Sequence, residues 1–149
     1  YKLYQQHPQI TTDSRDCPKG SIFLALKGES FDGNQFAASA LEKGCAYAII
    51  DDKSVMPDGD NRFILVDNCL QTFKDLAREH RRQFDIPVIG ITGTNGKTTT
   101  KELVAAVLSQ KFNVLYTQGN FNNDVGVTKT LFRNRAGASI FCPASRPKE

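Results

Sequence analysis

No apolar run in the 149-residue sequence approaches the roughly 20 residues that a membrane-spanning helix needs. The first six residues, Tyr-Lys-Leu-Tyr-Gln-Gln, do not form a signal peptide either. Hydrophobic residues make up 40% of the chain and charged residues 23%, which is an ordinary globular composition. We therefore expect a cytoplasmic protein without a membrane partner, made of one domain or of one small domain and part of another.

Cysteine is scarce and widely spaced. The four cysteines, Cys17, Cys45, Cys69 and Cys142, include no C-x-x-C pair, and His80 is the one histidine near any of them. This spacing indicates neither a zinc site nor a small disulfide framework, so we expect reduced and mostly buried thiols. The chain has no internal repeat and no low-complexity tract.

An excess of charge of one sign is also missing from most of the chain. The net charge of +3 lies within residues 133–149, where four Arg and Lys side chains outnumber Glu149. Such a tail could contact nucleic acid, but four cations without aromatic partners are more often a solvated end. We predict no nucleic-acid partner, and no pattern predicts an oligomer.

What the sequence does contain is an α/β pattern in two parts that meet near residues 84–87. In the first part the predicted strands are 21–26, 46–51 and 62–67, and the predicted helices are 35–43 and 68–83. The second helix places one apolar face at three- and four-residue intervals, formed by Leu70, Phe73, Leu76, Ala77 and His80. Asn68 or Asp67 is its expected N-cap.

The most informative stretch is residues 90–99, Gly-Ile-Thr-Gly-Thr-Asn-Gly-Lys-Thr-Thr. It joins an apolar run, predicted as a buried strand through Val88, Ile89 and Ile91, to a predicted helix over 101–110. A glycine-rich loop at a helix N-terminus directs N–H groups and the positive end of the helix dipole toward an anion. Lys97 would then reach terminal phosphates, and the Thr98 hydroxyl would ligate Mg²⁺. The alternative is a glycine-rich turn without a ligand.

The predicted helix after this loop is amphipathic. Its apolar face is formed by Leu103, Val104, Val107 and Leu108.

The generic phosphate-loop pattern G-x-x-x-x-G-K-[ST] fails narrowly, because Ile91 stands six positions before Lys97. The string T-G-T-N-G-K-T-T resembles instead the ATP loop of the Mur ligases and the related folylpolyglutamate synthetases. The resemblance implies ATP and Mg²⁺ as cofactors, with Lys97 and Thr98 acting in catalysis and Thr98 holding the metal. The implied ATP-binding residues are Gly93, Thr94, Asn95, Gly96, Lys97, Thr98 and Thr99.

A second constellation lies in the first part. Taken alone, Asp-Ser-Arg at 13–15 is a turn in which Arg15 pairs with a neighbouring aspartate, and Asp-Gly-Asn at 32–34 is a loop before a helix. Considered together with the phosphate loop, both segments resemble the N-terminal domain of Mur ligases, where they help to bind the UDP end of the substrate. The resemblance implies substrate contacts from Ser14, Arg15 and Asn34, although histidine is frequent at the last position in the family.

A third segment, residues 118–127, follows a predicted strand at 113–117. It resembles the G-N-x-N-N-x-x-G-V stretch of the Mur ligases that add D-alanyl-D-alanine. This resemblance implies that Asn120 and Asn122 contact substrate or ATP, since asparagine supplies neutral donors and acceptors. The alternative for Asn122 and Asn123 is that they cap the next helix.

The resemblance covers about residues 10–132 and implies a fold and a reaction. The expected fold is α/β, with a UDP-sugar-binding domain over 1–84 and the start of a P-loop parallel-sheet ATPase domain over 85–149. The implied reaction moves the ATP γ-phosphate to the carboxylate of UDP-N-acetylmuramoyl-tripeptide, and the amine of D-alanyl-D-alanine then attacks the acyl phosphate. These two substrates are the expected partners, and peptidoglycan synthesis is the expected process.

Residues 134–149 resemble nothing in the family and show no clear strand or helix period. After residue 133 the family pattern leads one to expect an apolar strand leading to a Mg²⁺-ligating glutamate and, later, a carbamylated lysine. The sequence of residues 134–149 indicates neither. We therefore expect these 149 residues to be an inactive N-terminal part of a longer ligase. Two other functions stay open, a non-catalytic nucleotide-binding module and an unrelated small P-loop NTPase.

Overall fold

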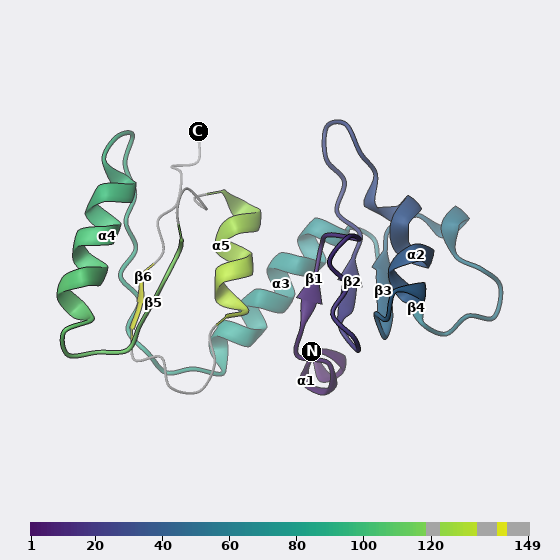
Figure 1. The fold of residues 1–149 in the computed structure, drawn as a ribbon, viewed down its shortest axis with the longest axis horizontal. Helices are drawn as coiled ribbons and strands as arrows, with labels where there is room; N and C mark the ends of the chain where they lie inside the picture. The colour runs from purple at the N-terminus through teal and green to yellow at the C-terminus, as the bar shows by residue number, and fades with distance from the viewer. Residues whose placement is uncertain (119–122, 134–139, 143–149) are drawn as a thin grey trace. The chain divides into compact units, whose positions relative to one another are not determined.

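The computed structural model describes residues 1–118, 123–133 and 140–142 (Figure 1). The chain divides into two compact units, Tyr1–Leu76 and Ala77–Glu149. Helix α3 (Cys69–Arg82) begins in the first unit and ends in the second. No helix in the described ranges is long and apolar enough to cross a membrane.

The first unit is built on a four-stranded parallel sheet with the strands in chain order. The strands are β1 (Ile10–Thr11), β2 (Ile22–Leu24), β3 (Tyr47–Ile50) and β4 (Phe63–Leu65). Helix α1 (Lys2–Gln6) precedes β1, a 3-10 helix (Gly33–Phe36) and α2 (Ala37–Glu42) join β2 to β3, and a second 3-10 helix (Lys53–Val55) follows β3. Neighbouring parallel strands need a crossover connection, because a hairpin turn would make the second strand antiparallel to the first.

The core of the first unit surrounds the two central strands. Phe23 and its two neighbours in β2 are almost fully buried, although successive side chains of a strand point to opposite faces. Both faces of the sheet are therefore covered, as expected for a parallel sheet. Helix α2 contributes Ala37, Ala40 and Leu41 to this core.

These elements confirm the predicted strands and helices of the first part, each within a few residues of the expected ends. Asn68 is the cap of α3, since its side-chain oxygen accepts from the Gln71 N–H at 2.8 Å. Of the predicted apolar face of α3, Phe73, Ala77 and His80 are buried and Leu70 is exposed.

The second unit contains a two-stranded parallel sheet of β5 (Val114–Tyr116) and β6 (Ile140–Cys142). In Figure 1 this pair lies between α4 (Lys97–Leu108) and α5 (Asp124–Leu131). Strand β5 was predicted, whereas the expectation of no strand within 134–149 was wrong. Strand β6 has only three residues, too few to show a hydrophobic period. It forms through its pairing with β5, which is distant in sequence.

The run before the phosphate loop is not the buried strand that its β-branched residues predicted. Val88 and Ile91 form only single bridges, and Val88 is 47% exposed. Ile89 is 37% exposed as well, whereas Ile91 is half-buried, so the run is covered only in part, and strand propensity depends on such packing against neighbours.

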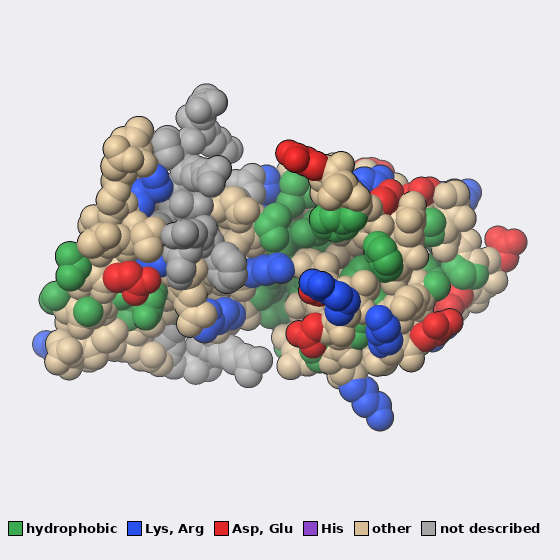
Figure 2. All heavy atoms as spheres, turned by 45° about the horizontal axis from the view of Figure 1, so that its top comes forward, with side chains coloured by type: hydrophobic (Ala, Val, Ile, Leu, Met, Phe, Trp, Pro, Cys, Tyr) green, Lys and Arg blue, Asp and Glu red, His purple; other side chains and the backbone are tan. Residues whose placement is uncertain are grey.

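The predicted apolar face of α4 is divided in two. Leu103 and Val107 are 63% and 71% exposed, and Figure 2 shows hydrophobic side chains on this outer surface of α4. The buried residues of the helix are Lys101 and Ala105. Because α4 contacts β5 along one side, that side is covered and the other is not.

Candidate functional site

The loop before α4 depends on two glycines for its shape. Gly93 has φ 145° and Gly96 has φ 74°, values that residues with a side chain rarely adopt. A Cβ at Gly96 would meet no atom within 4 Å, so glycine is needed there for its backbone conformation and not for space. Thr94, Asn95 and Gly96 are exposed, which leaves the loop open to solvent.

The N-terminus of α4 is arranged as an anion site. Gly96 occupies the N-cap position and supplies no side-chain cap. The helical ladder begins with the bond from the Thr100 N–H to the Gly96 carbonyl at 2.9 Å, so the N–H groups of Lys97, Thr98 and Thr99 precede it. Backbone N–H groups and the helix dipole both favour a phosphate at this position.

Lys97 adds a positive charge to the same loop. Its ammonium group donates to the carbonyl of Gly93 and, at 3.2 Å, to that of Thr94. An ammonium has three donors and no acceptor, so it is suited to binding phosphate oxygens. The predicted residues 93–99 thus form the loop and the first turn of α4.

The metal prediction has partial chemical support. Thr98 follows Lys97 on α4, and a hydroxyl oxygen is a ligand type that Mg²⁺ accepts. Within the described ranges no group of three or more His, Cys, Asp or Glu side chains could hold a metal ion. The Thr98 hydroxyl is therefore a candidate Mg²⁺ ligand.

In the first unit the candidate substrate residues follow the carboxyl ends of neighbouring parallel strands. Residues 12–15 follow β1, residues 27–34 follow β2, and Asp51 follows β3. In open α/β sheets ligands bind at this edge. The topology thus places both predicted substrate segments at one edge of the sheet.

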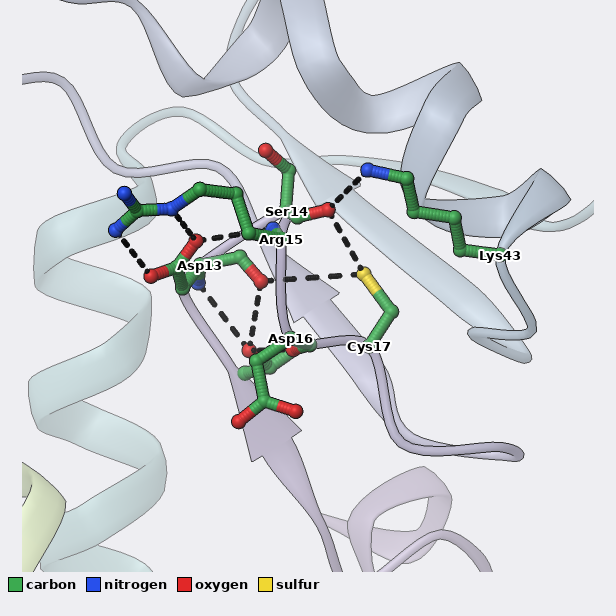
Figure 3. Close-up of polar contacts among 7 residues, drawn as sticks. Asp13, Ser14, Arg15, Asp16, Cys17 and Lys43 are labelled. Carbon is green, nitrogen blue, oxygen red and sulfur yellow. Dashed lines mark hydrogen bonds and ion pairs between the residues drawn. The ribbon is translucent and has the colours of Figure 1, made fainter.

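The loop after β1 is held by its own polar groups (Figure 3). The Arg15 guanidinium pairs with both carboxylate oxygens of Asp13, at 2.9 and 2.7 Å, and this pairing raises the pKa of Arg15. The Ser14 carbonyl accepts from Lys43 at 2.7 Å, while its side chain points away from these contacts. Arg15 is 87% exposed, so it can exchange Asp13 for an anionic ligand.

Asn34 is buried and fully engaged within the protein. Its side chain is 1% exposed, and its amide donates to Asp32 at 2.7 Å and to Asp51 at 2.8 Å. Its side-chain oxygen accepts from the Asp51 N–H at 3.0 Å. Gly33 lies so close to Leu26 that a Cβ would be 2.5 Å from its carbonyl oxygen. Asp-Gly-Asn therefore locks this loop against the ends of β2 and β3.

Asp51 is a functional candidate that sequence reasoning missed. Its carboxylate also accepts from Lys27 at 3.1 Å and from the Cys69 N–H at 3.1 Å. Burial alone would raise the pKa of Asp51, but the hydrogen bonds from Cys69, Asn34 and Lys27 outweigh it and lower that pKa. The sequence signal that could have identified Asp51 is its position directly after an apolar strand.

Cys17, Cys45 and Cys69 are free thiols, in agreement with the expectation. Cys45 and Cys69 are buried, and Cys17 is partly exposed. Burial raises the pKa of the Cys17 thiol to about 11, with a further contribution from Cys45. Burial and the nearby Asp51 raise that of Cys69 to about 12.

Asn120 and Asn122 lie outside the described residues. Asn123 is described, and its side-chain oxygen accepts from the Gly126 N–H at 2.8 Å. The capping alternative is thus confirmed for Asn123.

Two family models match most of the chain. The model described as "Mur ligase family, catalytic domain" matches residues 8–81, and "Mur ligase middle domain" matches residues 91–142. The expectation that residues 134–149 resemble nothing in the family was therefore wrong for 134–142.

Curated relatives carry the name UDP-N-acetylmuramoyl-tripeptide–D-alanyl-D-alanine ligase. The protein from Synechocystis is 50% identical over 123 residues, and that from Bacillus subtilis is 42% identical over 123 residues. Each match covers 82% of this chain and 27% of the relative, so the chain spans about a quarter of their length.

Solved structures of two MurF proteins are also similar to this chain. MurF from Acinetobacter baumannii has a TM-score of 0.86 and 36% identity, covering 93% of this chain and 30% of that one. MurF ligase from Thermotoga maritima, in complex with ADP, has a TM-score of 0.86 and 32% identity, covering 95% and 32%.

Proposed function

Because the chain belongs to the Mur ligase family, we propose that it carries the UDP-binding part and the phosphate loop of a D-alanyl-D-alanine-adding ligase. The proposed reaction joins UDP-N-acetylmuramoyl-tripeptide to D-alanyl-D-alanine at the expense of ATP, in peptidoglycan synthesis. The observation that carries the proposal is the open helix N-terminus with Lys97 in the loop, in a chain 50% identical to a ligase of that name.

The proposed domains are residues 1–84, for the UDP-sugar, and residues 85–149, for ATP. The family matches end at 81 and resume at 91, on either side of this boundary. A cytoplasmic location remains a prediction from sequence.

In the proposed ATP site, residues 93–99 hold the phosphates. The loop amides fix their position, and the Lys97 ammonium offsets the charge that builds up on the β,γ-bridging oxygen. Bound Mg²⁺, held with the help of Thr98, would supply further charge stabilisation. The Thermotoga maritima structure is a complex with ADP, which supports nucleotide binding by this chain.

In the proposed UDP site, Arg15 holds the diphosphate and Ser14 supplies a hydroxyl. A guanidinium can bind phosphate with two parallel hydrogen bonds, which lysine cannot reproduce. Since the polar atoms of Asn34 are used within the protein, we propose that it shapes this site and does not contact the substrate. Asn120 and Asn122 stay proposed contacts from the family resemblance.

The two alternative functions have less support. An unrelated small NTPase would not be expected to match Mur ligase models in both units. A non-catalytic nucleotide-binding module would have the same loop, and no observation favours it over the ligase.

Calorimetric titration of the chain with UDP, with a UDP-sugar and with ATP tests the two-site proposal. We expect Arg15→Ala to weaken UDP and UDP-sugar binding with no change for ATP, and Lys97→Ala to do the reverse. Lys111→Ala is a matched control, because this exposed lysine just after α4 is far along the helix from the loop. Loss of UDP binding in the Lys97 variant but not in the Arg15 variant would overturn the assignment.

A further inference from the structure

We propose that Phe31 is a stacking surface for the uracil base of the substrate. This inference rests on the proposed UDP-binding function and adds to it the residue that recognises the base. The observations that carry it are the closed turn on which Phe31 sits, the exposure of its ring and the charge around it.

The turn over residues 28–31 is closed by backbone hydrogen bonds. The Gly28 N–H donates to the Phe31 carbonyl at 2.9 Å, and Lys27 and Asp32 form an antiparallel bridge at its base. Below the base, the Gly33 N–H donates to the Leu26 carbonyl at 3.0 Å. The backbone that carries the Phe31 ring is therefore fixed to the end of β2.

The Phe31 ring packs against Gly28. A Cβ at Gly28 would be 2.3 Å from one ring carbon of Phe31 and 2.7 Å from the next, so any other residue would displace the ring. Phe31 is nevertheless 54% exposed. An aromatic ring that is supported on one side and open to solvent suits a planar ligand, since base–aromatic stacking needs a fixed and accessible face.

The charge around the turn determines which part of the ligand can bind there. Negative side chains outnumber the one cation, Lys27. Asp32, Asp51 and Asp52 act on its ammonium group, and Glu29 lies in the turn itself. A diphosphate would be repelled here, whereas a neutral base would not. Arg15, on the loop after the neighbouring strand β1, is the better partner for the diphosphate. The base end and the phosphate end of UDP thus match two adjacent loops of one sheet edge.

The test uses tryptophan as a reporter, because the chain contains none. In a Phe31→Trp variant, UDP should quench the indole fluorescence by stacking, and inorganic pyrophosphate should not. Phe36→Trp is the matched control, since Phe36 is also an exposed aromatic residue of the same connection between β2 and β3. Its fluorescence should not respond to UDP.

A second variant gives the energetic test. Phe31→Ala should weaken UDP binding about tenfold, within the usual range for loss of one base–aromatic stack. ATP binding should be unchanged, and the far-UV circular dichroism should match that of the wild type because the side chain is mostly exposed. Unchanged UDP affinity in Phe31→Ala would overturn this inference and leave the proposed function standing. Failure of UDP to bind the wild type would overturn both.

Discussion

Replacing Asn34 by alanine should destabilise the first unit through the loss of one buried hydrogen-bond network. The side chain makes three bonds, to the carboxylates of Asp32 and Asp51 and from the Asp51 N–H. Two of them involve a charged partner, and the substitution leaves a part-buried N–H without its acceptor. Asp51 keeps Lys27 and Cys69 as donors, which limits the loss. We expect the free energy of unfolding to fall by about 2–4 kcal/mol.

The assay must report on the first unit alone, because two units need not unfold together. Hydrogen exchange of the amides in β2 and β3 meets this requirement, followed at increasing urea concentration. Asn61→Ala is the control, since Asn61 is an exposed residue of a turn and its loss should change the stability by less than about 0.5 kcal/mol. A loss below about 1 kcal/mol for Asn34→Ala, or one equal to that of Asn61→Ala, would refute the structural role of Asn34.

Three further predictions concern other parts of the two sites. Gly96→Ala should cost about 1–2 kcal/mol through its left-handed φ and weaken ATP binding in calorimetry, whereas Gly90→Ala, with no positive φ and no atom within 4 Å, should change neither. Because the pKa of Asp51 is lowered in the folded state, its stabilising effect is present above about pH 4 and is lost as the pH falls through the folded pKa. The stability gap between wild type and Asp51→Asn in urea unfolding should therefore close on acidification, and a gap independent of pH would contradict this. Residues 1–149 alone should release no ADP when supplied with ATP and both ligase substrates, and release abolished by Lys97→Ala would show this to be wrong.

The elements from β2 to α3 that were predicted are each specified locally, whereas α1, β1 and the second 3-10 helix were not predicted. The apolar runs around β2, β3 and β4 and the period of α3 are complete within single stretches of sequence. The phosphate loop was predicted for the same reason, since the glycines, Lys97 and the following helix are contiguous.

The errors arose where a residue's environment is set by distant parts of the chain. Strand β6 forms against β5, and the exposure of Val88 and Leu103 depends on what packs over them. The role of Asn34 could not be predicted either, because its partner Asp51 is seventeen positions away and meets it only through the parallel pairing of β2 and β3.

The proposed ATP site lies at the N-terminus of a helix, whereas the proposed UDP site lies at the carboxyl edge of a parallel sheet. This difference fits the ligands assigned to them. At the start of α4 the backbone itself supplies the positive field, and Lys97 adds one charge to a loop shaped by glycine. That arrangement suits triphosphate binding with little dependence on the base. At the sheet edge of the first unit the proposed binding groups are side chains of two loops, one held by Asp13 and the other by Asn34 and Asp51, which suits recognition of one particular nucleoside. Selectivity for uridine over other nucleosides should therefore depend on the first unit, while the phosphate loop should tolerate a change of base.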